Sequence, residues 1–394
     1  MKVAYVYLNT LKTGQANAGQ VLRMVKALGR VAEVTFLASW VSESTLRKVS
    51  QFYGVEGCSA RISRLPVALA SQPFWLEKMT RTFYAVLVVS YLRLSSDEVV
   101  YTRDFGFIYF LSLLPRWMRP RQPILYEPHT IYHRSSPSKV TFSQEKRALQ
   151  TVKYFLPISN GIAEDLRKYF GVQNKMITVL PDGVDLQALT EAKGSRRSIL
   201  QRYGIATEVP LIVYTGSFLN WKGVDVLVQS VKHLQNLSSK IFILGGQGAD
   251  YERVFRLVRQ EKLEDRITLA KPRPFNEVLN ILKSSDIAVI PNTNTEIGGK
   301  YTSPLKLFEY MGCGLPIVAS DLPAMREVIT TGKNGYFFRP DDARDLARCL
   351  DLLLSQSELR IVMGNNNHEK AKKFSWSTRA QHIQRVADHV LNTH

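Results

Sequence analysis

A helix start, a lysine and a carboxylate stand close together in residues 302–329, which read TSPLKLFEYMGCGLPIVASDLPAMREVI. Ser303 is a good N-cap, and Pro304 suits the first helical position because its missing N–H costs nothing there. Glu309 falls mid-helix between two aromatic residues, where a carboxylate needs a partner. A helix N-terminus attracts an anion such as a diphosphate, and a carboxylate can clasp the vicinal hydroxyls of a ribose. The stretch therefore predicts a nucleotide-diphosphate site. The alternative is a structural helix whose Glu309 pairs with a nearby Lys or Arg.

A second cation precedes this stretch in the chain. Residues 210–216 predict a strand, residues 217–221 a loop, and Lys222-Gly223 opens the helix that follows. A lysine beside a glycine at a helix start favours phosphate binding through both its charge and the nearby backbone N–H groups.

The first half of the chain offers candidates of the same kind. Residues 2–8 predict a strand, and the loop after it carries Gly14 and Gly19 before an amphipathic helix, so that backbone can approach a ligand closely. Residues 99–103 predict a strand that ends in Arg103, and residues 123–129 a strand with His129 just past its carboxyl end. Ligands of open α/β sheets bind outside those ends, so Arg103 and His129 are site candidates.

Length and composition set the class. A chain of 394 residues with 45% hydrophobic and 22% charged residues predicts a soluble globular protein of two domains. The widely spaced Cys58, Cys313 and Cys349 form no metal or disulfide framework, which favours a reducing, cytosolic setting. The amino terminus predicts a strand rather than a signal peptide, and no apolar run reaches the roughly 18 residues that a membrane-spanning helix needs. We expect a cytoplasmic protein.

The net charge of +18 is unevenly placed, since residues 1–190 hold 24 Lys and Arg against 13 Asp and Glu. Residues 65–123 also interleave aromatic residues with Lys and Arg, a mixture typical of a bilayer interface. No RNA-binding or helix-turn-helix signature accompanies the charge, so we expect an anionic membrane surface or acceptor rather than nucleic acid. Arg116, Trp117, Arg119 and Arg121 are the expected membrane contacts. The alternative is two core helices with solvated basic ends.

Beyond these features, the pattern S-P-L-K-L-F-E-Y-M-x-x-G-x-P-I-V-A-S-D-L-P-x-x-R-E-V resembles the donor-site signature of retaining GT-B glycosyltransferases of family 4. The resemblance implies an α/β fold of two Rossmann-like domains facing a cleft. Residues 1–188 would form the acceptor-side domain and residues 189–373 the donor domain, with a linker within 190–203. A helix of about residues 374–394 would cross back to the first domain.

The implied activity is transfer of a hexosyl group, with retention, from a UDP- or GDP-linked sugar to a glycan or lipid-linked acceptor, as in cell-surface polysaccharide biosynthesis. The nucleotide sugar is a co-substrate, and neither a cofactor nor a metal is implied. The implied catalytic residues are His129 near the transferred sugar, Lys222 on the leaving diphosphate and Glu309 on the ribose. The implied donor-binding residues are Gly216, Ser217, Lys222, Gly246, Arg273, Glu296, Tyr301, Ser303, Pro304, Leu305, Lys306 and Glu309. The implied acceptor-side loop residues are Gly14, Gly19 and Arg103.

The chain departs from the family pattern at two places. Tyr301 stands where the first of two glutamates spaced by eight positions is usual, so Glu296 or Tyr301 is left to contact the donor sugar. Ser217 follows Gly216 where an arginine is frequent, so one phosphate contact is missing or comes from elsewhere. Two rival functions stay open. A sugar-nucleotide 2-epimerase or hydrolase of the same fold would need acid/base carboxylates, for which Glu127 and Asp104 are the candidates. A non-catalytic nucleotide-sugar-binding scaffold would need no such groups.

Overall fold

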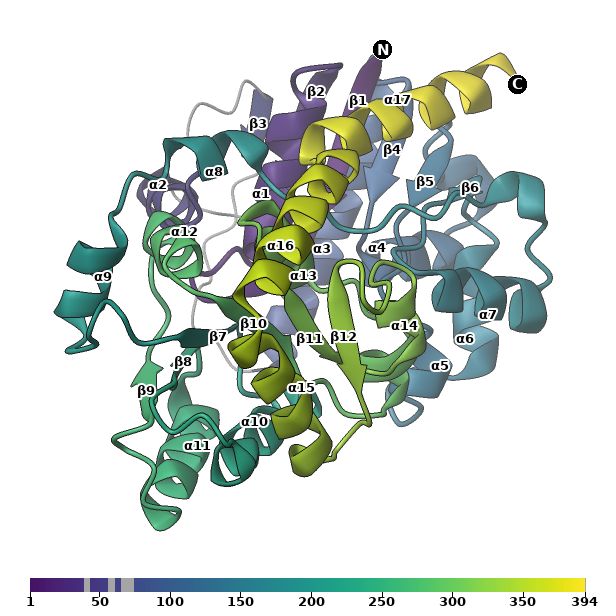
Figure 1. Cartoon of the computed structure of the whole chain (residues 1–394). Coiled ribbons are helices and arrows are strands. Elements are labelled where there is room, and N and C mark those ends of the chain that lie inside the picture. Colours follow the sequence, from purple (N-terminus) through teal and green to yellow (C-terminus); the bar gives the residue numbers. More distant parts are fainter. Residues whose placement is uncertain (39–42, 56–60, 65–73, 394) are drawn as a thin grey trace. The chain divides into compact units, whose positions relative to one another are not determined.

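A computed structural model describes residues 1–38, 43–55, 61–64 and 74–393, with 61–64 and 74–80 described by their backbone alone. Cys58 and the 65–73 part of the aromatic and basic stretch lie outside the described residues. The chain divides into two compact units (Figure 1). The first unit comprises Met1–Gln51, Val55–Pro181 and Trp376–His394, and the second comprises Phe52–Gly54 and Asp182–Ser375.

The first unit is built on a parallel sheet of six strands in the order β3-β2-β1-β4-β5-β6. Its strands are β1 (Lys2–Tyr7), β2 (Glu33–Ala38), β3 (Arg61–Arg64), β4 (Val99–Thr102), β5 (Ile124–Tyr126) and β6 (Tyr154–Phe155). The helices along this part of the chain are α1 (Ala16–Leu28), α2 (Glu43–Phe52), α3 (Phe74–Leu94), α4 (Phe105–Leu113), α5 (Tyr132–Ser135), α6 (Phe142–Leu149), α7 (Asn160–Phe170) and the C-terminal α17 (Trp376–Asn392), with short turns η1 (Arg116–Met118) and η2 (Asn174–Met176). This strand order is that of the dinucleotide-binding fold. The strands are parallel, and their order along the sheet reverses between β1 and β4, which is the switch point of the sheet.

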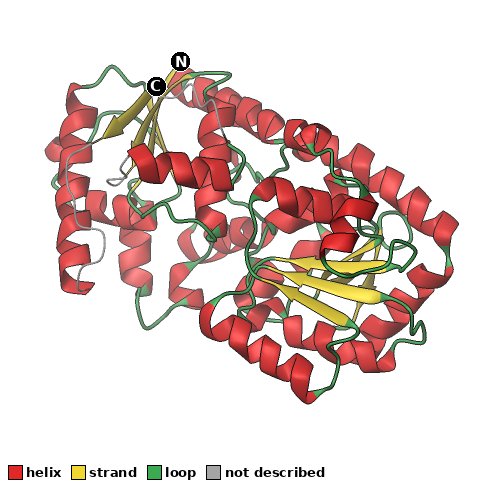
Figure 2. Ribbon diagram, turned by 90° about the vertical axis from the view of Figure 1, so that its left-hand side faces the viewer, coloured by secondary structure: helices red, strands yellow, loops and turns green. Residues whose placement is uncertain are grey.

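The second unit repeats the same topology in the order β12-β11-β10-β7-β8-β9, and Figure 2 shows its strands lying between helices. Its strands are β7 (Leu211–Thr215), β8 (Lys240–Leu244), β9 (Ile267–Ala270), β10 (Ile287–Ile290), β11 (Ile317–Ser320) and β12 (Gly335–Phe338). Its α-helices are α8 (Leu186–Glu191), α9 (Arg196–Arg202), α10 (Val224–Ser230), α11 (Gly248–Gln260), α12 (Phe275–Lys283), α13 (Leu305–Gly312), α14 (Pro323–Arg326), α15 (Ala343–Ser355) and α16 (Ser357–Ala371). Its other helical turns are η3 (Asn220–Lys222), η4 (Val231–His233), η5 (Glu296–Lys300) and η6 (Lys372–Phe374). The strand order of this second sheet reverses between β7 and β10, which is its switch point.

Both faces of the second sheet are buried, which explains its continuous apolar strands. Leu211 and Val213 of β7 point into one hydrophobic cluster, and Ile212 and Tyr214 point into another. Successive side chains of a strand alternate between faces, so a strand covered on both sides must be apolar throughout. The expected α/β class with two Rossmann-like domains is confirmed.

Two expectations about local structure are wrong. Helix α13 begins at Leu305 with the extended Pro304 at its N-cap position, and the Ser303 hydroxyl accepts a hydrogen bond from the backbone N–H of Asp182 at 2.8 Å instead of capping the helix. The expected linker within residues 190–203 instead contains the end of α8 and all of α9. Both helices pack into the second unit's core through Leu189 and Ile199, so the chain passes between units at Pro181–Asp182.

Candidate functional site

The switch point of the second sheet is shaped by glycines. Gly216, directly after β7, has a φ of 127°, a region that side chains rarely adopt. Gly223, at the end of turn η3, has a φ of 65°, and a Cβ built on it would lie 1.7 Å from the carbonyl oxygen of Pro291. Only glycine therefore lets this turn approach the end of β10, and the turn carries Lys222.

Lys222 is half-buried, and its Nζ lies 3.7 Å from the centroid of the Trp221 ring. The Trp221 carbonyl accepts a hydrogen bond from the N–H of Thr293 at 3.0 Å, which ties the turn to the loop after β10. Burial lowers the pKa of Lys222 to about 7, because an ammonium is less stable away from water. A charge held this way gains from any anion that binds next to it.

Lys306, the second residue of α13, is a second cation at this place, with only 7% of its surface exposed. Its Nζ lies 3.6 Å from the centroid of the Tyr214 ring and makes no hydrogen bond to any residue that the structure describes. A Cβ built on Gly216 would come within 2.8 Å of this Nζ, so the ammonium lies directly over the glycine. Burial, and then the charge of Lys222, hold the pKa of Lys306 well below its usual range.

Glu309 lies one helical turn after Lys306 and is half-buried rather than enclosed. Its charge opposes the fall of the Lys306 pKa, and it adds to burial in raising the pKa of Tyr310. The Tyr310 hydroxyl accepts a hydrogen bond from the N–H of Thr215 at 2.7 Å, which anchors α13 to the end of β7. Lys306 thus lies over Gly216, and the charges of Lys222 and Glu309 are both close enough to shift its pKa.

The next three expected donor-binding residues are Gly246, Arg273 and Ser217, and their surroundings say less about nucleotide binding. Gly246 lies under the Phe218 ring, where a Cβ would come within 2.0 Å of a ring carbon, so its lack of a side chain serves packing. Arg273 is exposed in the loop after β9. The Ser217 carbonyl accepts a hydrogen bond from the Tyr214 hydroxyl at 2.7 Å.

At the two positions left for the donor sugar, burial differs. Glu296 is half-buried and opens the η5 turn, whereas Tyr301, just after that turn, is only 1% exposed. Beside them, Pro304 is buried and Ser303 and Leu305 are half-buried.

In the first unit, Gly14 has a φ of 77° in the loop after β1, whereas Gly19 is buried inside α1. The switch point itself is held by Asp104, which follows β4 and accepts hydrogen bonds from the backbone N–H of Leu8 at 3.0 Å and from the Asn9 amide at 2.8 Å. Asp104 also caps α4 through the N–H of Phe107. This carboxylate is therefore engaged in holding the loops.

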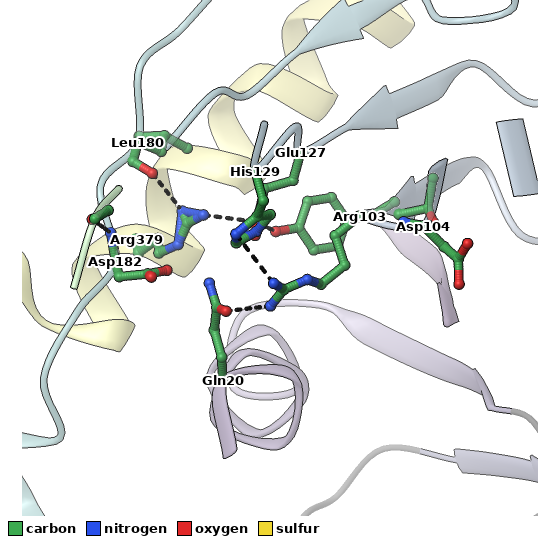
Figure 3. Close-up of polar contacts among 11 residues, drawn as sticks. Gln20, Arg103, Asp104, Glu127, His129, Leu180, Asp182 and Arg379 are labelled. Atoms are coloured by element: carbon green, nitrogen blue, oxygen red, sulfur yellow. Dashed lines mark hydrogen bonds and ion pairs between the residues drawn. The ribbon is translucent and has the colours of Figure 1, made fainter. Parts of the chain in front are cut away.

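Figure 3 shows the polar cluster around His129. The ring Nε2 lies 2.5 Å from Oε1 of Glu127, and the ring Nδ1 lies 3.1 Å from an Arg103 nitrogen. Arg103 also donates to the Gln20 side chain. Glu127 accepts from Arg379 at 2.6 Å and from the Tyr101 hydroxyl.

Burial and the Arg103 charge lower the pKa of His129 to about 4, and Arg379 and His129 hold the pKa of Glu127 well below its usual range despite its burial. Sequence reasoning missed Gln20 and Arg379 as members of this cluster. The sequence does contain a clue to Arg379. It is an arginine on the buried face of the last helix, which otherwise carries apolar residues such as Trp376, Ala380 and Ile383.

Within residues 1–38, 43–55, 61–64 and 74–393, no three His, Cys, Asp or Glu side chains gather as a metal site would require. Over the same part of the chain, no helix combines the length and apolar character needed to cross a bilayer.

Comparison with known proteins assigns both halves of the chain to glycosyltransferase families. Residues 195–370 match the family "Glycosyl transferases group 1", and residues 20–188 match "Glycosyltransferase Family 4". A D-inositol 3-phosphate glycosyltransferase of Xylanimonas cellulosilytica is 28% identical over 225 residues, which cover 55% of this chain and 52% of that protein. The matching region thus spans about half the length of this curated relative.

Solved structures agree over nearly the whole chain. A sucrose-phosphate synthase of Thermosynechococcus elongatus superposes with a TM-score of 0.78 at 16% identity, covering 100% of both chains. Anabaena HepE in complex with UDP-glucose gives a TM-score of 0.74 at 16% identity, covering 99% of this chain and 100% of that one. At such identity these likenesses establish the fold, and the family matches establish the relationship. The chain belongs to the group 1 and family 4 glycosyltransferases.

Proposed function

We propose that the chain transfers a hexosyl group from a nucleotide-diphosphate sugar to a hydroxyl of a glycan or lipid-linked acceptor, with retention and without a metal. The observation that carries this is the Lys306 ammonium, buried over Gly216 without a hydrogen bond to the described residues and repelled by Lys222. Two cations are costly to bury beside each other, and a diphosphate offsets that cost. Ser217 leaves no arginine side chain beside Gly216, and Lys306 supplies a charge in that place.

The same cations would drive the chemistry. Departure of the sugar leaves negative charge on the nucleotide diphosphate, and preorganised cations stabilise this charge more in the transition state than in the bound substrate. The leaving phosphate then serves as the base for the acceptor hydroxyl, which attacks from the same face. The similar Anabaena HepE was solved in complex with UDP-glucose, so UDP is the first nucleotide to test.

Glu309→Gln should weaken UDP binding by about 1–3 kcal/mol, the scale of a charge-assisted hydrogen bond, because the amide holds the ribose hydroxyls less well. Isothermal calorimetry measures the effect directly, with the exposed Glu358→Gln of α16 as the matched control. Unchanged UDP affinity in Glu309→Gln would remove Glu309 from the nucleotide site.

A panel of UDP- and GDP-sugars separates the proposed transferase from the epimerase, the hydrolase and the non-catalytic scaffold. Nucleotide release that depends on an acceptor means a transferase, a changed sugar means an epimerase, acceptor-independent release means a hydrolase, and binding without turnover means a scaffold. Glu127 is paired with Arg379, and Asp104 caps α4, so the two carboxylates available to an epimerase are already engaged. This favours the transferase.

We further propose that the first unit receives the acceptor at the inner face of a cytoplasmic membrane. Around η1, Leu113, Arg116, Trp117, Met118 and Arg121 are exposed, with 75% of Trp117 accessible. We call these five residues the η1 surface. Arg119 was also expected to contact the membrane, but its guanidinium instead donates to the carbonyls of Leu114 and Ser112 at 3.0 and 3.3 Å.

The protein should sediment with anionic vesicles at low salt and be released as salt rises, since each basic residue near an anionic bilayer contributes about 1 kcal/mol. Arg116→Glu with Arg121→Glu should abolish sedimentation, whereas Arg344→Glu, exposed on α15, should not. Protein that stays in the supernatant with anionic vesicles would indicate a soluble acceptor.

A further inference from the structure

The hydrogen bonds around His129 determine where its ring proton lies. An arginine side chain has only N–H donors, so Nδ1 of His129, 3.1 Å from Arg103, must be the accepting nitrogen. The single ring proton is then on Nε2, which donates to Glu127 Oε1 at 2.5 Å. Both ring nitrogens are used and the ring is neutral, so His129 is held in one tautomer and orientation (Figure 3).

Glu127 is held in turn by Arg379. The two side chains are 3% and 4% exposed, and the Arg379 nitrogen lies 2.6 Å from Glu127 Oε2. A carboxylate this deeply buried keeps its charge and direction only beside a cation. Arg379 also donates to the carbonyl of Leu180 at 3.1 Å, which fixes the guanidinium from a second side.

We propose that Arg379, the fourth residue of α17, is a positioning residue that acts through Glu127 to hold His129 as a neutral imidazole with its proton on Nε2. This rests on the proposed function and on the expectation from the family resemblance that His129 lies near the transferred sugar. It goes further by assigning His129 a role without proton transfer, and by making a residue of the C-terminal helix part of the first unit's site.

The charges that face His129 explain why Arg379 matters. They come from Glu127 after β5, Arg103 after β4 and Arg379 on α17, with the Tyr101 hydroxyl of β4 also bound to Glu127. Burial, then the charge of Arg103 and last that of Arg379 disfavour an imidazolium against the single carboxylate, and together they lower the His129 pKa to about 4. Without Arg379, one cation faces one carboxylate, and His129 takes up a proton more readily. Protonated at Nδ1, it can no longer accept from Arg103.

The test follows His129 by ¹⁵N NMR of histidine-labelled protein, with His129→Gln to assign the signals among the seven histidines. The wild type should show a protonated Nε2 at neutral pH and titrate well below its ordinary range. Arg379→Met should raise the titration midpoint by at least about one pH unit, the scale of one nearby charge. Arg379→Lys, which keeps the charge, should restore the low midpoint. Arg385→Met, exposed on the same helix, should change nothing.

Kinetics provide the second readout. Arg379→Met should lower kcat about tenfold or more, because a displaced site residue loses its alignment, and should leave the KM for the nucleotide sugar unchanged. A wild-type His129 that titrates near its ordinary range or carries its proton on Nδ1 would overturn the proposal, even if Arg379→Met fails to fold. Loss of kcat with an unchanged His129 titration would overturn it as well. Absence of any sugar transfer by the wild type would instead reject the proposed function, and the spectra would still decide the positioning role.

Discussion

Lys222→Ala is expected to lower the turnover number about 10²-fold or more. Lys222 is half-buried, and its ammonium lies over the Trp221 ring beside the switch point of the second sheet. A preorganised charge aimed at a developing anion contributes roughly 3 kcal/mol or more to the transition state, and alanine removes it without refilling the site. Steady-state release of UDP with a saturating acceptor measures the loss.

The matched control is Lys232→Ala, whose ammonium pairs with Glu261 at 3.0 Å on the surface of the same unit. Lys232→Ala should retain full turnover. If Lys222→Ala lowered only the melting temperature, and turnover per folded molecule held, Lys222 would be a structural residue rather than a phosphate-binding one.

Lys222 also predicts a pH dependence. Its pKa is lowered to about 7 by burial in the free protein, and a bound diphosphate raises it again because the anion favours the charged form. The kcat/KM for the nucleotide sugar reports the free enzyme and should fall as pH rises above about 7, whereas kcat should change less. A kcat/KM that stays constant from about pH 6 to about pH 9 would contradict the predicted titration of Lys222.

Lys306→Met is expected to act in opposite directions on stability and on binding. Lys306 is 7% exposed, and its ammonium makes no hydrogen bond to the described residues. Methionine fills a similar volume without a buried charge, so the free energy of unfolding should rise by about 1–3 kcal/mol, even after loss of the contact with the Tyr214 ring. UDP affinity should fall at least about tenfold, since a diphosphate contact is lost.

Chemical denaturation and calorimetry on the same preparation measure both effects. Lys333→Met, on an exposed lysine of the same unit, should change neither quantity. A Lys306→Met variant that is less stable and binds UDP normally would show that Lys306 serves packing through the Tyr214 ring and has no part in nucleotide binding.

The sequence alone predicted the fold class, which the structure confirms, and it proposed Lys222 and Glu309 for the candidate site of the second unit. Strands such as β7 are apolar at every position because both faces of their sheet are buried, and this pattern is readable without coordinates. Lys222 and Glu309 were predicted from residue type and from their place on helices after strands, which are local properties. The Ser303 cap was misjudged because the competing partner, the N–H of Asp182, lies 121 residues away in the chain.

Only the tertiary structure placed the long-range partners. Lys306 lies over Gly216 and Tyr214 because α13 is anchored to the end of β7, and the position of a lysine in a helix does not reveal which strand its ammonium reaches. The pair of Arg379 with Glu127 joins residues 252 positions apart. Such pairing depends on how α17 packs against α1, through apolar side chains that many helices share, so the sequence pattern indicates a core-facing arginine but not the carboxylate that it meets.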